Sequence, residues 1–151
     1  MKKIIYVLLS TLIIGLGLYF FVFRGKENIS EEIPEKITYY KSSSDLIVVE
    51  LPFPGAVTGK EFTVIGKARR VWFFEASFPI DVLDKDGKIL FQTYATAQGE
   101  WMTRDFVPFK SQLIKIPETY IGPATLVLKK DNASGLPEHD ASISFPFTIE
   151  Y

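Results

Sequence analysis

Residues 71–83 read VWFFEASFPIDVL, and this stretch decides the fold class. Its even positions are all apolar, whereas its odd positions include Glu75 and Asp81. Residues 142–150, SISFPFTIE, repeat the alternation. A period of two is typical of a strand with one buried face, because successive side chains point to opposite sides of a sheet. Both stretches are therefore predicted to be strands, with Trp72 in the core.

The chain beyond residue 45 follows the same pattern. The predicted strands lie at 46–51, 62–68, 71–83, 88–97, 104–116, 123–130 and 142–150. Turn residues separate them, and Asp86-Gly87 between two alternating runs is typical of a tight hairpin. Pro146 has no backbone donor, which favours a position at a sheet edge or a bulge. This pattern, without a helical segment, predicts an all-β, two-sheet sandwich over residues 46–151, and a small barrel is the alternative.

A hydrophobic run precedes this domain. Ile4 to Phe23 is a stretch of 20 residues without a charge. As a helix it would span roughly 30 Å, the thickness of the hydrocarbon core of a membrane. A cleaved signal peptide has a shorter apolar region that ends in a small-x-small site, and here Gly15-Leu16-Gly17 is followed by more apolar residues. We therefore expect residues 1–24 to be a retained anchor with a transmembrane helix at about 4–23.

Charged residues flank the hydrophobic run. Lys2 and Lys3 precede it, together with the terminal amine, and Arg24 and Lys26 follow it. A short tail with the larger positive charge stays inside, so the domain is expected on the extracytoplasmic side of the cell membrane, on a single-pass chain. Residues 25–45 are first acidic and then serine-rich, and they are predicted to be a flexible linker.

Composition excludes several functional classes. The chain has no cysteine, which removes disulfide scaffolds, thiolate metal sites and thiol nucleophiles. Because it has a single histidine, His139, a hydroxyl nucleophile would lack the paired base that activation needs. After residue 26 the chain carries 13 basic and 18 acidic side chains, a poor match to nucleic acid. No enzyme activity, cofactor or metal site is expected.

Two polar segments could nevertheless suggest ligands. Asp84 to Gly87 resembles the start of a calcium loop, but it lacks the further acidic ligands that such a loop needs, so a hairpin turn is expected. Asp131 to Asp140 reads DNASGLPEHD. Asn and Asp stabilise turns by bonding nearby backbone, so a structural loop is favoured there over a recognition loop or a metal site.

Several short motifs occur in a characteristic order along the domain. They are Gly66-Lys67-Ala68, Trp72 to Pro79 (WFFEASFP), Asp86-Gly87, Glu100-Trp101-Met102, Asp105 to Phe109 (DFVPF) and Lys130 to Glu138 (KDNASGLPE). In this order they resemble the immunoglobulin-like domain family of bacterial spore germination, over roughly residues 47–150. The resemblance implies an immunoglobulin-like sandwich in an envelope protein that is not an enzyme, with no catalytic residues to carry over.

Strand parity suggests a contact surface. If each connection reverses the chain, Arg69-Arg70, Gln98 to Thr103 and Asp131 to Asp140 share one end of the sandwich, opposite the Asp84–Gly87 turn. Loops gathered at one end of a sandwich commonly bind partners, so we expect contact there. The candidate partner-contact residues are Trp101, Met102, Asp131, Asn132 and His139. Trp101 is either exposed or folded over the end of the sandwich.

These features favour a membrane-anchored, extracytoplasmic, non-catalytic interaction module of the bacterial cell envelope. Its expected partners are the membrane, through the N-terminal helix, and an envelope protein or cell-wall component. One alternative is a structural subunit of a surface assembly, joined through an exposed edge strand. Another is a cell-wall glycan-binding domain, which should show two or more exposed aromatic residues on one flat face. Only Trp101 can be nominated for such a face from the sequence.

Overall fold

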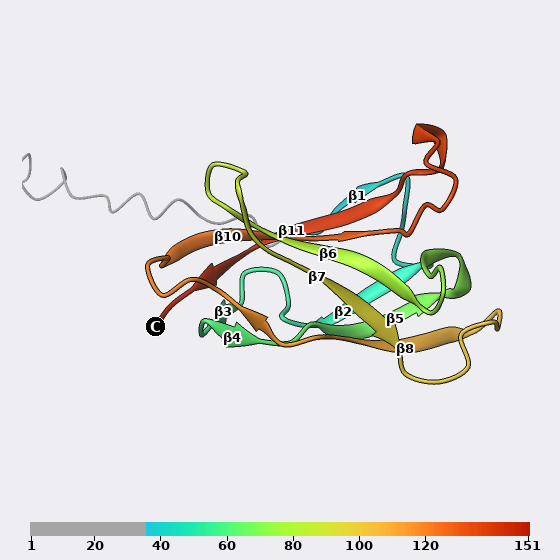
Figure 1. The fold of residues 1–151 in the computed structure, drawn as a ribbon, viewed down its shortest axis with the longest axis horizontal. Helices are drawn as coiled ribbons and strands as arrows, with labels where there is room; N and C mark the ends of the chain where they lie inside the picture. Colours follow the sequence, from blue (N-terminus) through green and yellow to red (C-terminus); the bar gives the residue numbers. More distant parts are fainter. Residues whose placement is uncertain (1–35) are drawn as a thin grey trace, which may run out of the picture. The chain divides into compact units, whose positions relative to one another are not determined.

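Residues 36–151 are described by the structure, a computed structural model, and they form an all-β domain (Figure 1). Its strands are β1 (Thr38–Tyr40), β2 (Ile47–Leu51), β3 (Val57–Thr58), β4 (Glu61–Phe62), β5 (Ile65–Arg69), β6 (Ser77–Asp84), β7 (Ile89–Ala97), β8 (Phe106–Ser111), β9 (Ile114–Lys115), β10 (Gly122–Lys129) and β11 (Ser142–Ile149). Two 3-10 helices, η1 (Arg70–Trp72) and η2 (Pro137–His139), lie in connections of this range. Over the same range, no helix has the length and apolar character needed to cross a membrane. The predicted span at 4–23 lies outside the described residues.

One sheet folds over itself to make two layers. Its order is β1-β11-β10-β6-β7-β8-β5-β2, and β3 pairs in parallel with the end of β11. In Figure 1 the strands from β1 to β6 in this order form one layer, β8, β5 and β2 form the other, and β7 crosses between them. β7 can do so because it pairs with β6 over most of its length and with β8 through Ala95–Ala97. The predicted sandwich-like fold is confirmed, but its two layers are joined in one sheet.

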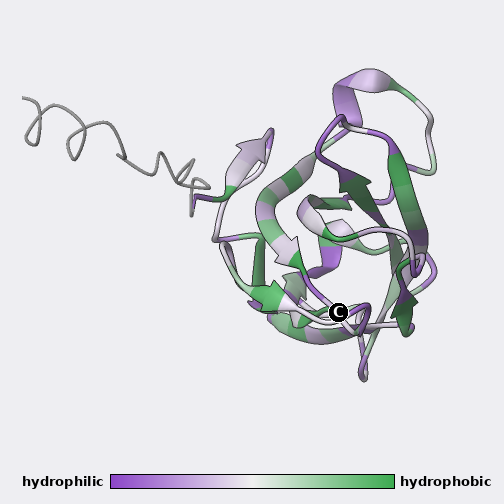
Figure 2. Cartoon of the chain, turned by 90° about the vertical axis from the view of Figure 1, so that its left-hand side faces the viewer, coloured by the Kyte–Doolittle hydropathy of each residue, from purple (hydrophilic) through white to green (hydrophobic). Residues whose placement is uncertain are grey.

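Figure 2 views the domain from the left of Figure 1 and shows the sheet curled around a central interior, with hydrophobic and hydrophilic bands alternating along the strands. Aromatic side chains fill much of this interior. The ring of Phe78 lies 5.7 Å from that of Trp72 and 5.0 Å from that of Phe109, both edge-on. Edge-to-face packing is favourable because the positive ring edge meets the negative ring face. Trp72 is fully buried, as the alternation predicted.

A glycine allows the neighbouring strands β5 and β2 to fit against the ring of Phe109 in this core. A Cβ atom on Gly66 of β5 would lie 2.2 Å from the carbonyl oxygen of Val48 and 2.8 Å from the ring of Phe109. No larger residue fits without moving the backbone of β2, so the glycine of the Gly66-Lys67-Ala68 motif is required by packing.

Several predicted strands are divided or extended. The stretch at 62–68 separates into β4 and β5, and the stretch at 104–116 separates into β8 and β9. The end of the predicted linker at 25–45 is also different, because Thr38–Tyr40 forms β1 and pairs with Ser142–Ser144. The flexible-linker prediction is therefore corrected for these residues, and the part of it before residue 36 lies outside the described range.

The largest correction concerns the stretch that decided the fold class. Only its second half is a strand, β6, whereas η1 and a tight turn occupy the first half. Phe74 and Ser77 exchange two backbone hydrogen bonds of 3.0 Å, and the residues between them, Glu75 and Ala76, have φ of 49° and 62°. This turn shifts the alternation, so Phe73 is buried and Phe74 is exposed.

Pro146 occupies an edge position, as predicted. On one side of β11, β1 pairs with Ser142–Ser144 and β3 pairs with Thr148–Ile149. Pro146 lies in the gap between these two partners, where its carbonyl accepts a 2.8 Å bond from Gly55. No neighbouring strand needs a donor at this point, so proline is tolerated there.

Candidate functional site

Four connections meet at one end of the domain, on the right of Figure 1. They are residues 41–46, 70–76, 98–105 and 130–141, and together we call them the loop end. The strand register places them together, since Arg69 pairs with Phe106 and Lys129 pairs with Ser142. Strand parity predicted three of these connections. The fourth was missed because it had been assigned to the linker.

Arg69 ties two of the connections to the sheet. Its Nε donates a 2.7 Å bond to the carbonyl oxygen of Asp45, and its Nη1 donates a 2.6 Å bond to that of Arg104. The guanidinium also lies 4.4 Å from the centre of the Phe106 ring. Hydrogen bonds from a charged group are stronger than neutral ones, so Arg69 holds these connections in a fixed arrangement.

The remaining connections are joined in the same way. The backbone amide of Asp131 donates a 3.1 Å bond to the carbonyl oxygen of Trp72. The amine of Lys41 donates a 3.0 Å bond to the carbonyl oxygen of Pro137. Each of the four connections is thus hydrogen-bonded to another connection or to a strand that borders the loop end. These bonds limit the movement of its backbone.

Trp101 resolves the two alternatives left by the sequence. It is half-buried, and its ring lies 6.4 Å from that of the buried Phe73, so it folds over the end of the sandwich. Its neighbour Met102 is 62 % exposed, and the Met102 amide donates a 2.8 Å bond to the Glu100 carboxylate. Trp101 therefore supports the surface, and Met102 is the residue of this pair that a partner could reach.

The 130–141 connection uses most of its polar side chains internally. The amide nitrogen of Asn132 donates 2.8 Å bonds to the carbonyl oxygen of Leu136 and to the carboxylate of Asp140. The hydroxyl of Ser134 bonds the side-chain oxygen of Asn132 and lies 2.9 Å from Nδ1 of His139. These contacts are those of a self-supporting loop.

Asp131 experiences a different environment at the start of this loop. Desolvation by burial raises the pKa of its carboxyl, and the negative charge of Glu75 raises it further. Glu75 lies in the tight turn before β6, so this repulsion acts between two connections of the loop end. Asp131 and Asn132 are both half-buried, whereas His139 is exposed.

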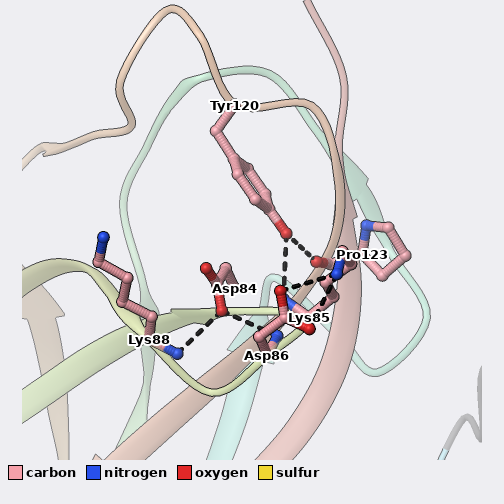
Figure 3. Close-up of polar contacts among 6 residues, drawn as sticks. All are labelled: Asp84, Lys85, Asp86, Lys88, Tyr120 and Pro123. Carbon is pink, nitrogen blue, oxygen red and sulfur yellow. Dashed lines mark hydrogen bonds and ion pairs between the residues drawn. The ribbon is translucent and has the colours of Figure 1, made fainter.

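The turn at the opposite end is a hairpin, as predicted (Figure 3). One carboxylate oxygen of Asp84 accepts 2.8 Å bonds from the backbone amides of Asp86 and Lys88, and Gly87 has φ of 79°. The hydroxyl of Tyr120 accepts a bond from the Lys85 amide and donates one to the Pro123 carbonyl. The Asp84 carboxylate thus bonds the turn's own backbone, and residues 36–151 contain no cluster of three or more metal-ligating side chains.

The loop end exposes several large apolar side chains among its charged and polar ones. Its exposed large hydrophobic side chains are Val71, Phe74, Met102 and Leu136, from three of the connections. The sequence nominated only Met102. Phe74 was assigned to the core by the strand alternation, and neither Val71 nor Leu136 lies in a pattern that distinguishes an exposed residue from a buried one.

Comparison with protein families gives a match to the immunoglobulin-like domain of bacterial spore germination over residues 46–135. Comparisons with curated proteins and with solved structures give no match. The matched range begins one residue before β2 and ends within the 130–141 connection, so it contains most of the loop end. Because it spans more than half of the sequence, the chain belongs to the immunoglobulin-like domain family of bacterial spore germination, as its motifs predicted.

Proposed function

We propose that this protein is a non-catalytic binding module on the extracytoplasmic face of the cell membrane, anchored by residues 4–23, and that its loop end contacts a protein of the bacterial envelope. The observation that carries the proposal is the set of exposed apolar side chains that three connections bring to one end. Exposed apolar side chains that gather on a soluble domain are typical of interaction sites.

The fixed arrangement of the loop end supports this function. Arg69 and Lys41 bond carbonyl oxygens of neighbouring connections, and Asn132 bonds two groups of its own loop. A partner therefore meets connections that are already held in place, and binding loses less conformational entropy than it would with mobile loops. Membership of an immunoglobulin-like family agrees with a binding rather than a catalytic role.

The edge strands give less support to a structural subunit joined by strand pairing. At one end of the sheet order, β1 has only three residues. At the other end, β2 has an irregular register between Val49 and Leu51. Short edges and bulges are features that prevent strand addition, so assembly through either edge is disfavoured.

Cross-linking in the native cells tests the proposal. The double variant Met102→Asp, Leu136→Asp places two charges on the loop end, and we expect it to lose the partner that the wild-type chain captures in the membrane fraction. Trp101→Ala is less informative, because Trp101 packs on Phe73 and its loss also affects folding.

The matched control is Ile89→Asp, Ile121→Asp. Both residues are exposed, and both lie outside the loop end. This control should capture the partner as the wild type does. Equal capture by the loop-end variant would contradict the contact surface, and recovery of the native chain in the soluble fraction without detergent would contradict the anchor.

A further inference from the structure

The outer face of the larger layer presents a second surface. The register of β1, β11, β10, β6 and β7 aligns one residue from each strand across this face. The aligned residues are Tyr40, Ser142, Lys129, Pro79 and Tyr94, and we call them the tyrosine row. Tyr40 pairs with Ser142, Ser142 pairs with Lys129, and Pro79 pairs with Tyr94. Lys129 follows Leu128, which pairs with Ile80, so the row is continuous.

Exposed aromatic rings mark the two ends of this row. Tyr40 is 53 % exposed and Tyr94 is 55 % exposed. Four strand intervals separate them, a distance of about 19 Å. The amine of Lys41 lies 5.3 Å from the centre of the Tyr40 ring and helps to hold it in place. This face thus presents two exposed aromatic residues, the number expected of a glycan binder, and it does not include Trp101.

Two hollows lie along the row and meet at Pro79. The first has a volume of about 360 Å³ and is lined by Tyr40, Pro79, Lys129, Lys130, Asp140, Ala141 and Ser142. The second has a volume of about 310 Å³ and is lined by Pro79, Asp81, Gln92, Thr93, Tyr94 and Gln112. Each hollow thus combines an aromatic ring with amide, hydroxyl or charged groups, the mixture that orients a small polar ligand.

A fixed polar group lies beside the row. The carboxylate of Asp81 has only 6 % of its side chain exposed, although it points to the outer face. It accepts a 2.9 Å bond from Gln92 and forms an ion pair with Lys129. These bonds orient the Gln92 amide and the Lys129 amine at the surface, so their remaining donors and acceptors are held in place for a ligand.

We infer that the tyrosine row is a binding site for a linear polysaccharide that lies across the strands. Pyranose rings have apolar C–H faces, which stack on aromatic rings, and hydroxyl groups around their edges, which bond amides and charged groups. The separation of the two tyrosines fits a chain of several sugars and not a single one. Among the residues that line the two hollows, Lys129 and Lys130 are balanced by Asp81 and Asp140, so the hollows lack the net positive charge that a nucleic-acid strand needs.

This inference goes beyond the proposed function, because it concerns the outer face of the sheet and a different class of partner, although Lys130, Asp140 and Ala141 of the loop end also line the first hollow. It rests on the proposed function only in that both describe a non-catalytic binding module. The two surfaces can still be tested separately, because Tyr40 and Tyr94 lie outside the loop end, and Met102 and Leu136 line neither hollow.

Retention on insoluble polysaccharides tests the site. The full chain, in detergent micelles, is incubated with purified peptidoglycan, chitin or cellulose particles in separate arms, which distinguish the possible sources of the glycan. We expect the wild type to be retained on at least one of them. Tyr40→Ala and Tyr94→Ala should each weaken retention about three- to tenfold, and the double variant should abolish it.

Matched variants separate stacking from folding. Tyr40→Phe and Tyr94→Phe keep the rings and should keep most of the retention. Tyr151→Ala removes a tyrosine that is 86 % exposed and lies outside the row, and it should have no effect. The urea midpoint of each variant, measured by pulse proteolysis, shows whether the domain is folded.

Three results of the retention experiment would overturn the inference. They are no retention of the wild type on any of the particles, retention that is unchanged in folded Tyr→Ala variants, and retention that is lost equally in Tyr151→Ala. Binding of a proline-rich peptide that the same tyrosine variants abolish, without binding to glycans, would also overturn it, because such peptides dock on aromatic surfaces too. If the chain binds no glycan but its loop end still captures a partner in the cross-linking experiment, the proposed function is unaffected.

Discussion

β11 and the segment from residue 71 to residue 83 have the same alternation of apolar and polar residues, but they form different structures. β11 is a strand throughout, and its buried and half-buried residues alternate without a break. The other segment begins with η1, makes a tight turn at Glu75 and Ala76, and becomes a strand only at Ser77. Alternation therefore identifies residues that can form a strand, but it does not show where the chain turns back.

The turn before β6 shows why the pattern is not sufficient. Positive φ at both central residues of a two-residue hairpin is usually supplied by Asn-Gly or Asp-Gly. Here the central residues are Glu75 and Ala76, which give no such signal. Glu and Ala adopt positive φ only at a cost, because the Cβ atom approaches the neighbouring carbonyl. Surrounding contacts, including the burial of Trp72 and Phe73, must offset this cost.

The largest effect should come from replacing phenylalanines by alanine in the two segments. Phe145→Ala in β11 should lower the free energy of unfolding by about 4 kcal/mol, because it leaves a cavity in the core. Phe73→Ala should lower it by about 3 kcal/mol, since Phe73 packs on Phe78 and Trp101. Phe74→Ala should cost less than about 1 kcal/mol, because Phe74 is exposed.

Pulse proteolysis of the full chain over a urea series measures these three values. Phe74 is the informative position, since the uninterrupted alternation assigns it to the core and the turn exposes it. If Phe74→Ala lowered the free energy of unfolding as much as Phe145→Ala, Phe74 would be buried. The segment would then be a strand throughout, without the turn at Glu75 and Ala76.

Glycine substitutions should change the free energy of unfolding in opposite directions in the two segments. Ala76→Gly should raise the free energy of unfolding by about 0.5 kcal/mol, because glycine adopts φ of 62° without the steric penalty of a Cβ atom. Ser144→Gly in β11 should lower it by about 0.5–1 kcal/mol, since glycine loses more conformational freedom in a strand. Thermal denaturation of both variants provides the comparison, and destabilisation by Ala76→Gly would argue against the turn.

The smallest effect concerns the charge that lies close to the turn. The pKa of Asp131 is raised above its ordinary value, so the folded state binds more protons than the unfolded state between that ordinary value and the raised pKa. Stability contributed by this group is therefore present at low pH and decreases as pH rises through that window. Asp131→Asn should remove the decrease and stabilise the domain at pH 7 by about 0.3 kcal/mol, a small value because water screens a partly exposed carboxylate.

Urea midpoints at pH 3 and pH 7 measure this difference. The stabilisation by Asp131→Asn should be present at pH 7 and absent at pH 3, where the wild-type carboxyl is also neutral. Glu75→Gln should give a smaller change of the same sign, because Glu75 is the secondary cause of the shift. Destabilisation by Asp131→Asn at pH 7 would indicate that the charged carboxylate makes a favourable contact instead.

In the candidate site, too, the sequence pattern predicted the placement of the loops but not the roles of individual side chains. Three of the four connections of the loop end follow from strand parity, since antiparallel neighbours reverse direction at each turn. The roles of individual side chains did not follow. Asn132 was a candidate contact and is half-buried with its amide bonded inside its loop, whereas Phe74 was assigned to the core and is exposed. These outcomes depend on rotation of the backbone at a few residues, which residue type alone does not specify.

The sequence by itself determined the all-β fold class, the family and the hairpin at Asp86-Gly87, because period-two alternation and turn chemistry are local properties of the chain. The tertiary structure decided which half of residues 71–83 forms a strand, and it decided the order of strands in the sheet. Only that order places Tyr40 and Tyr94 on one face, with three other strands between them. Register between distant segments results from packing of the whole core, and no local pattern contains it.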